Sequence, residues 1–391
     1  MIEFIKGKLF NAQFIRILGQ TNYQAAELSD CFSIIDQLDP TNLNTWYDTW
    51  SKIAEKTHKL AIAYSDNNEY ESAYTAYLKA STYYRAAYFF LEDNPNDKRI
   101  ESLLNHSIDT FRNALKLSKL NYEIVTIPYN NINLPAYLYL QPEQTIKRPI
   151  IINCAGGDGT KEEAFTTAYE AYVRGYHCLT FEGPGQGSVL RLQGATFTPS
   201  WDEVIKTVID YLSNYTAIDM SHIIYYGKSF GGYLAAQAAT KEKRLKTVVL
   251  DPAQYGMLDN LKNSFLKGTA GDIPLYKAIE NTLNQTSDND LKFMFNSRLW
   301  RYGVDSYKDF CTILNDYDIY DDIENISSAV MVFDNEEEYL SKGQASVFYD
   351  KLTSEKAYYQ FKQQQATGGH CQPLAPKIFY AKMFEWISKI V

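Results

Sequence analysis

The spacing of apolar and polar residues changes near residue 121 and divides the chain into two parts. Before that point, apolar and small residues recur every three or four positions, as in 69–91 and again in 100–117. This spacing places them on one face and is typical of amphipathic helices that pack together. An Asp-Asn-Pro-Asn-Asp break at 93–97 separates the two stretches. We therefore expect residues 1–121 to form an all-helical N-terminal domain that caps the rest of the chain.

After residue 121, short apolar runs alternate with helical segments. Strands are expected at 123–128, 134–140, 149–154, 176–181, 223–226, 247–250, 329–333 and 357–361. Helices are expected at 162–174, 201–212, 233–239, 344–352 and 376–390. Such alternation predicts an α/β fold over residues 122–391, with a mostly parallel eight-stranded sheet and helices on both faces. The alternation is interrupted at about 252–325, which we interpret as an insertion that covers the site.

Composition and charge narrow the functional classes. The 391 residues are 45% hydrophobic, with a mean hydropathy of −0.35, which is typical of a soluble chain with more than one domain. A net charge of −9 argues against nucleic acid or an anionic membrane as a partner. Five scattered cysteines without Cys-x-x-Cys spacing are typical of a reduced compartment. We therefore expect a cytoplasmic protein that needs neither a metal nor another cofactor.

A nucleophile motif follows the fifth strand. Residues 227–231 read Gly-Lys-Ser-Phe-Gly, which matches the G-x-S-x-G elbow between a strand and a helix. The glycines suit a turn so tight that side chains there would collide with the neighbouring elements. The motif predicts that Ser229 projects its hydroxyl from the carboxyl edge of the sheet. An ordinary glycine-rich connection is the alternative.

A serine hydroxyl needs a base to remove its proton, and five histidines are candidates. Four of them lie in the helical part or in strands: His58, His106, His177 and His222. His370 lies in a glycine-flanked loop, 366–372, after the last strand. Reactive groups gather beyond the carboxyl ends of parallel strands. We therefore expect His370 to be the base.

The acid of such a triad follows a late strand. Strand 329–333 is followed by Asp-Asn-Glu-Glu-Glu at 334–338 and then by Leu340-Ser341. The acid is expected a few residues after the strand end and shortly before the Leu340-Ser341 pair. Glu337 fits both distances best. The alternatives that stay open are Asp334, Glu336, Glu338 and, after the strand that follows the elbow, Asp251. Asp251 is also a candidate to orient His370 or to contact the substrate.

Backbone N–H groups must stabilise the oxyanion. One is expected from Phe230, directly after the serine, and another from Gly157 or Asp158 in the glycine-rich loop after strand 149–154. This loop lacks the Lys-Ser/Thr ending of a phosphate-binding P-loop. Three further residues, the last from a second glycine-rich loop at 183–187, are expected to line the substrate site: Gly156, Lys228 and Gly185.

Five segments spread over most of the chain match one known family. They are 80–90 (Ala-Ser-Thr-Tyr-Tyr-Arg-Ala-Ala-Tyr-Phe-Phe), 156–162 (Gly-Gly-Asp-Gly-Thr-Lys-Glu), 182–187 (Glu-Gly-Pro-Gly-Gln-Gly), 227–232 (Gly-Lys-Ser-Phe-Gly-Gly) and 368–372 (Gly-Gly-His-Cys-Gln). Together they resemble the α/β-hydrolase superfamily, in the branch with a helical N-terminal domain. That branch includes the dihydroxypseudooxynicotine hydrolase and the polyketide-shortening hydrolases of pigment pathways. One departure is the acid, because relatives usually carry Asp in a Gly-x-x-Asp turn where this chain has Asp-Asn-Glu-Glu at 334–337.

The resemblance implies an activity, a substrate class and partners. Hydrolases of this branch cleave a carbon–carbon bond beside a ketone in retro-Claisen fashion, and Ser229 and His370 are compatible with that chemistry. The implied partners are a small-molecule ketone or polyketide, free or bound to a carrier protein, and a second copy of the chain in a homodimer. The resemblance places the dimer contact in the helical domain, residues 1–121. A carboxylesterase or thioesterase, an acyltransferase or cyclase, and a ligand-binding protein on a disabled hydrolase scaffold stay open as alternatives.

Overall fold

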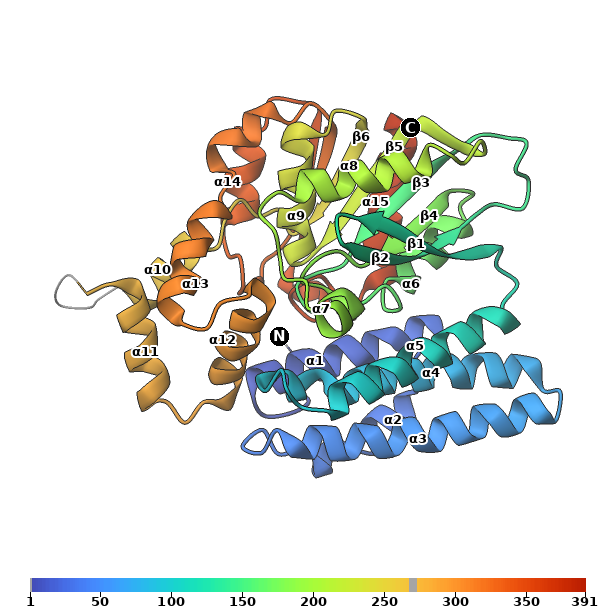
Figure 1. The fold of residues 1–391 in the computed structure, drawn as a ribbon, viewed down its shortest axis with the longest axis horizontal. Helices are drawn as coiled ribbons and strands as arrows, with labels where there is room; N and C mark the ends of the chain where they lie inside the picture. The colour runs from blue at the N-terminus through green and yellow to red at the C-terminus, as the bar shows by residue number, and fades with distance from the viewer. Residues whose placement is uncertain (1, 267–272) are drawn as a thin grey trace. The chain divides into compact units, whose positions relative to one another are not determined.

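The computed structural model describes residues 2–266 and 273–391. Its chain contacts divide it into two units (Figure 1). The first unit contains Met1–Leu120, Thr286–Trp300 and Pro373–Lys377. The second contains Asn121–Gln285, Arg301–Gln372 and Ile378–Val391. The expected boundary after residue 121 lies next to this division, but two later segments group with the N-terminal helices. Residues 267–272 of the expected insertion lie outside the described residues.

The first unit is built from helices. They are α1 (Lys8–Gly19), α2 (Leu28–Phe32), α3 (Asn44–Asp66), α4 (Tyr70–Tyr88) and α5 (Arg99–Leu117). In Figure 1, α3, α4 and α5 lie side by side, and α4 packs against both of the others. The core between them is rich in aromatic residues, with Trp46, Trp50 and Tyr83 fully buried. The predicted helical N-terminal region is confirmed.

The second unit contains a sheet of eight described strands in the order β1-β2-β4-β3-β5-β6-β7-β8. Their bounds are β1 (Tyr122–Tyr129), β2 (Ile132–Tyr139), β3 (Arg148–Cys154), β4 (His177–Phe181), β5 (Ile218–Lys228), β6 (Leu245–Asp251), β7 (Ala329–Asn335) and β8 (Lys356–Phe361). β2 pairs antiparallel with β1 and β4, and all other neighbouring strands run parallel. The predicted α/β fold is confirmed.

Helices cover both faces of this sheet. They are α6 (Phe165–Tyr172), α7 (Gly187–Gln193), α8 (Trp201–Leu212), α9 (Phe230–Lys241), α14 (Gln344–Lys351) and α15 (Pro376–Ile390). Along β5, Tyr225 accepts a hydrogen bond from Trp201 of α8 at 2.8 Å, whereas the Tyr226 ring lies 5.4 Å from Phe379 of α15. Because successive strand residues point to opposite faces, α8 and α15 lie on opposite sides of the sheet, as Figure 1 shows. The short helix α7 was not predicted from the sequence.

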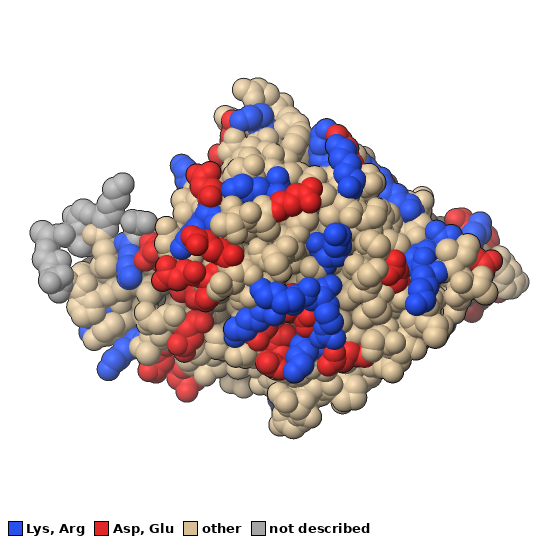
Figure 2. Space-filling view, turned by 90° about the horizontal axis from the view of Figure 1, so that it is seen from above, with Lys and Arg blue, Asp and Glu red and all other residues tan. Residues whose placement is uncertain are grey.

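The described part of the expected insertion is helical. Its helices are α10 (Leu258–Phe265), α11 (Leu275–Gln285), α12 (Asn289–Tyr302) and α13 (Tyr307–Ile313). Most of α12 groups with the first unit. None of the described helices combines the length and the apolar character that crossing a membrane requires. Figure 2 shows basic and acidic side chains next to one another on the face that it presents.

Candidate active site

Ser229 lies in the sharp turn between β5 and α9. Its backbone has φ 57° and ψ −127°, a conformation that costs on the order of 1–3 kcal/mol in a residue with a side chain. Two glycines permit the turn. A Cβ on Gly227 would lie 2.0 Å from the carbonyl oxygen of Gly231, and a Cβ on Gly231 would lie 2.6 Å from the carbonyl oxygen of Cys154. The Ser229 N–H donates to the Asp251 carbonyl at 2.6 Å. The turn is therefore held against β6 in the strained geometry of a nucleophile elbow.

A chain of hydrogen bonds joins Ser229 to His370 and a carboxylate. His370 Nε2 lies 2.8 Å from Ser229 Oγ, and His370 Nδ1 lies 2.6 Å from Glu338 Oε2. The other carboxylate oxygen, Oε1, accepts the N–H groups of Leu340 at 2.8 Å and Ser341 at 3.1 Å. Because an ionised carboxylate only accepts, Nδ1 carries the imidazole proton in this contact and Nε2 can accept a hydrogen bond from the Ser229 hydroxyl.

The charges of Glu338 and His370 stabilise each other. Burial by itself would raise the pKa of Glu338, but the charge and hydrogen bond of His370 and the two backbone N–H bonds hold that pKa below its usual range. Burial would lower the pKa of His370, whereas Cys371 next to it and the Glu338 carboxylate raise that pKa well above its ordinary value. The arrangement therefore favours an ionised glutamate and an imidazole that binds a proton strongly.

The partner of His370 is Glu338, and the expectation for Glu337 was wrong by one position. β7 continues to Asn335, whereas the predicted strand ended at residue 333. A turn then follows in which the Glu338 N–H donates to the Asn335 carbonyl at 2.9 Å. The Glu337 N–H donates to the side-chain oxygen of Asn335 at 2.9 Å. This turn buries Glu338, which was among the alternatives, and leaves Glu337 half-buried.

Two other candidate acids bind groups away from His370. Asp334 accepts hydrogen bonds from Tyr358 at 2.6 Å and from Gln360 at 3.1 Å, both on β8. Glu336 is exposed and forms an ion pair with Lys362 at 3.0 Å. These contacts fix the loop that carries Glu338 to the neighbouring strand.

Asp251 is a second buried carboxyl near the imidazole. It ends β6 opposite Lys228, which ends β5, and it is fully buried. With its amide oriented to donate, Gln372 reaches both carboxyl oxygens, at 3.1 and 3.2 Å. Burial raises the pKa of Asp251 to about 7, although the charges of Lys228 and His370 act to lower it. Asp251 can therefore hold a proton near neutral pH and is placed to orient groups around His370.

The glycine-rich loop after β3 lies against Ser229. A Cβ on Gly156 would lie 2.9 Å from the Ser229 Cβ, and one on Gly157 would lie 3.8 Å from the Phe230 Cβ. Within the described residues, the N–H groups of Gly157 and Phe230 have no acceptor in the protein. Asp158 follows in the same loop. Two such donors next to a serine are what an oxyanion hole requires.

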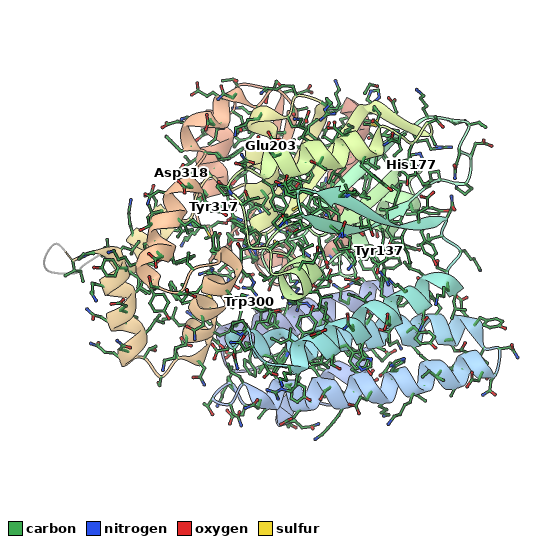
Figure 3. The ribbon with its side chains drawn as sticks, viewed as in Figure 1. Tyr137, His177, Glu203, Trp300, Tyr317 and Asp318 are labelled. Atoms are coloured by element: carbon green, nitrogen blue, oxygen red, sulfur yellow. The ribbon has the colours of Figure 1, made fainter. Side chains whose placement is uncertain are left out.

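Gly185 supports an aromatic group beside this site. A Cβ on Gly185 would lie 2.4 Å from the Phe197 ring, and that ring is 5.1 Å from the ring of Phe230. Tyr302 and Tyr317, whose rings lie 6.1 and 6.4 Å from Phe230, come from the expected insertion; Tyr317 is labelled in Figure 3. The later part of this insertion therefore packs against Phe230, the residue that follows Ser229.

Two other histidines have partners elsewhere in the second unit. His177, labelled in Figure 3, accepts the backbone N–H of Gln141 at 3.0 Å in the core of the sheet. His222 lies 2.7 Å from the carboxylate of Asp219. Among the residues that the structure describes, no group of three or more His, Cys, Asp or Glu side chains could hold a metal ion.

Comparison with known proteins gives the family. No protein-family model matches the chain. It is 32% identical over 323 residues to the hydrolyase poxO of Penicillium oxalicum, across 78% of this chain and 76% of that protein. It is 31% identical over 324 residues to the alpha/beta hydrolase psoB of Aspergillus fumigatus, across 77% of this chain and 72% of that protein. The chain belongs to the α/β-hydrolase family. This α/β-hydrolase also shares its fold with the solved 2,6-dihydroxy-pseudo-oxynicotine hydrolase, with a TM-score of 0.74 and 18% identity over 95% of both chains.

Proposed function

We propose that this α/β-hydrolase cleaves a carbon–carbon bond next to a ketone, by retro-Claisen hydrolysis of a β-dicarbonyl compound or polyketide. Ser229, His370 and Glu338 act as the triad. The observation that carries the proposal is the chain of hydrogen bonds, 2.8 and 2.6 Å long, that ends on a serine in a strained elbow. The family resemblance supports the carbon–carbon class of reaction.

In the proposed reaction, Ser229 Oγ attacks a ketone carbonyl while His370 Nε2 takes its proton. The N–H groups of Phe230 and Gly157 stabilise the alkoxide. Collapse of the alkoxide breaks the adjacent carbon–carbon bond, and the carbon leaves as an enolate that the second carbonyl of the substrate stabilises. His370 protonates this carbon to give a ketone. Water then hydrolyses the serine ester to release a carboxylic acid; direct attack by water that His370 activates would give the same two products.

The substrate would be a small-molecule ketone or polyketide, free or bound to a carrier protein. A β-dicarbonyl unit is required because a carbon leaving group without a neighbouring carbonyl is too basic to depart. Asp251, which can hold a proton near neutral pH, would orient His370 or donate to a substrate oxygen. Glu338 would keep the imidazole in the tautomer that accepts the serine proton.

The test compares two probe substrates, benzoylacetone and a p-nitrophenyl ester. The wild-type enzyme, Ser229→Ala and the surface control Ser221→Ala are incubated with each, and the acid and ketone products are quantified. Equal amounts of acid and ketone from benzoylacetone, lost in Ser229→Ala and kept in Ser221→Ala, would support the proposal. Cleavage of the ester alone would favour a carboxylesterase, and ligand binding without turnover would favour a binding protein.

Water elimination is a second candidate function, which the name hydrolyase given to the relative poxO favours. In that reaction His370 would remove a proton next to a carbonyl, the oxyanion hole would hold the enolate, and His370 would return the proton to the β-hydroxyl group, which would leave as water. No serine ester forms on this route. Conversion of a β-hydroxyketone to an enone at a similar rate by wild-type and Ser229→Ala enzymes would therefore favour elimination over hydrolysis.

A further inference from the structure

The loop 182–187, Glu-Gly-Pro-Gly-Gln-Gly, contributes no member of the triad, yet its Gln186 side chain is fully buried. Gln186 Nε2 donates to the carbonyl of Ala155 at 2.7 Å and to that of Gly156 at 3.2 Å. Its amide oxygen accepts the N–H of Gly183 at 3.0 Å. The amide oxygen of Gln186 is therefore bonded to its own loop, and the amide nitrogen is bonded to the loop beside Ser229.

These bonds fix a peptide unit of the oxyanion hole. The carbonyl of Gly156 and the N–H of Gly157 belong to the same planar trans peptide, so they point in opposite directions. Gln186 holds the carbonyl end, which determines the direction of the N–H at the other end. Because glycines flank this peptide, local sterics restrain its rotation very little. A donor from outside the loop is therefore needed to hold its orientation.

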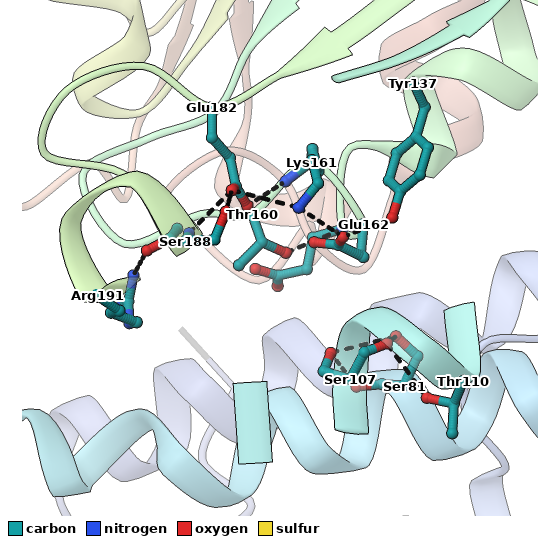
Figure 4. A network of polar contacts seen from close by, with 12 residues as sticks. Ser81, Ser107, Thr110, Tyr137, Thr160, Lys161, Glu162, Glu182, Ser188 and Arg191 are labelled. Carbon is teal, nitrogen blue, oxygen red and sulfur yellow. Dashed lines mark hydrogen bonds and ion pairs between the residues drawn. The ribbon is translucent and has the colours of Figure 1, made fainter. Parts of the chain in front are cut away.

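A second contact holds the far end of the same loop. The Lys161 N–H donates to Glu182 Oε1 at 3.1 Å, and its ammonium lies 3.3 Å from Glu182 Oε2 and 2.8 Å from Glu162 Oε1. Figure 4 shows Lys161 between the two carboxylates, with Ser188 also bonded to Glu182. Lys161 and Glu182 are fully buried. The loop 182–187 thus holds the loop 155–161 at both ends.

We propose that Gln186 is a positioning residue for the oxyanion hole. By holding the Gly156 carbonyl, it keeps the Gly157 N–H directed at the oxygen on which negative charge develops. This inference rests on the proposed function, because it assumes that Ser229 attacks a carbonyl. It assigns Gln186 of the loop 182–187 a role in the rate of that attack.

The test replaces the Gln186 amide without changing its size. Gln186→Glu places a carboxylate, which cannot donate, against two carbonyl oxygens, and Gln186→Met removes the donor at every pH. Since loss of one oxyanion donor lowers kcat by about 10²–10³-fold, we expect both variants to lose about 10–100-fold in kcat near pH 8 with KM changed less than about threefold. As the pH falls and the carboxyl regains its proton, it becomes a donor again. The ratio of Gln186→Glu to wild-type kcat should therefore rise on acidification, while that of Gln186→Met stays flat.

Gln193 on α7 provides a matched control. Its amide donates to the Asn133 carbonyl at 2.8 Å and accepts the Asn133 N–H at 2.9 Å, in the β1–β2 hairpin. Gln193→Glu should keep wild-type kcat at every pH. If Ser229-dependent turnover of the probe substrate persists and both Gln186 variants stay within about threefold of the wild type, the positioning role is overturned while the proposed function stands. If the wild type itself shows no Ser229-dependent turnover, the proposed function fails and this inference fails with it.

Discussion

Replacing Glu338 by Gln changes one atom of the hydrogen-bond chain behind the nucleophile. In the protein, Oε1 of Glu338 accepts the N–H groups of Leu340 and Ser341, and Oε2 accepts from His370. The amide has only one oxygen, and two backbone donors compete for it. When the oxygen stays with them, the NH₂ group faces Nδ1 of His370. That nitrogen must then be unprotonated, so Nε2 carries the proton and cannot accept the one from Ser229.

The size of the effect follows from this change of tautomer. Holding the imidazole of a serine hydrolase triad in the wrong tautomer lowers kcat by about 10⁴-fold. At about 1.4 kcal/mol for each factor of ten, this corresponds to about 5 kcal/mol of transition-state stabilisation. Loss of the negative charge also removes a group that raises the pKa of His370. The residual activity of Glu338→Gln should therefore begin at a lower pH than that of the wild type.

Glu337→Gln is the matched control, because it makes the same chemical change one residue away on the same loop. Steady-state kcat for the probe substrate should stay within about threefold of the wild type in Glu337→Gln and fall about 10⁴-fold in Glu338→Gln. Melting temperatures of both variants show whether the fold is retained. Similar losses in the two variants, or a larger loss in Glu337→Gln, would refute the assignment of Glu338 as the acid.

Three further outcomes follow from the buried charges. Lys161→Met should lower the free energy of unfolding by about 3–5 kcal/mol, because it leaves Glu182 buried without its cation; an unchanged urea midpoint would refute this. For Asp251, whose pKa is raised from 3.8 to about 7 in the folded protein, the unfolded chain releases the proton first as the pH rises. The folded protein should therefore lose stability between about pH 4 and pH 7, and Asp251→Asn should remove this part of the slope in urea unfolding measured across that range; an identical slope would be inconsistent with the buried carboxyl. Because His370 must be neutral to accept a proton and its pKa is raised, kcat/KM should rise with pH with an inflection above 6.5; an inflection below that value would contradict the coupling to Glu338.

Local steric demands explain which features could be predicted from the sequence. The elbow requires small residues at Gly227 and Gly231 whatever surrounds it, so the five-residue motif predicted the position of Ser229. The bounds of α8 and α15 were also predicted, because their apolar spacing and their starting residues are local signals. His370 could be selected because it alone among the histidines lies in a glycine-flanked loop after the last strand.

The acid could not be selected in this way, because long-range contacts determine the register of its loop. The side-chain nitrogen of Asn335 donates to Thr367 and to the carbonyl of Gly369, both at 2.9 Å, and so joins the end of β7 to the histidine loop. These contacts extend the strand past its apolar residues and bring Glu338 inward in place of Glu337.

The role of Gln186 was likewise beyond sequence reasoning. The loop 182–187 could be recognised from its glycines, but the carbonyl oxygens that Gln186 binds belong to another loop, thirty and thirty-one residues earlier in the chain. The pairing of β3 with β4 brings the two loops together. Side chains whose function is to orient a distant peptide leave no local pattern.

Reaction of the enzyme with a fluorophosphonate probe, followed by peptide mapping, tests the central claim most directly, because it needs no knowledge of the natural substrate. We expect a single covalent adduct on Ser229 in the wild type, formed at a rate that falls sharply in His370→Ala and in Glu338→Gln and is unchanged in Glu337→Gln. An adduct on another residue, or labelling of Ser229 at the same rate without His370, would contradict it.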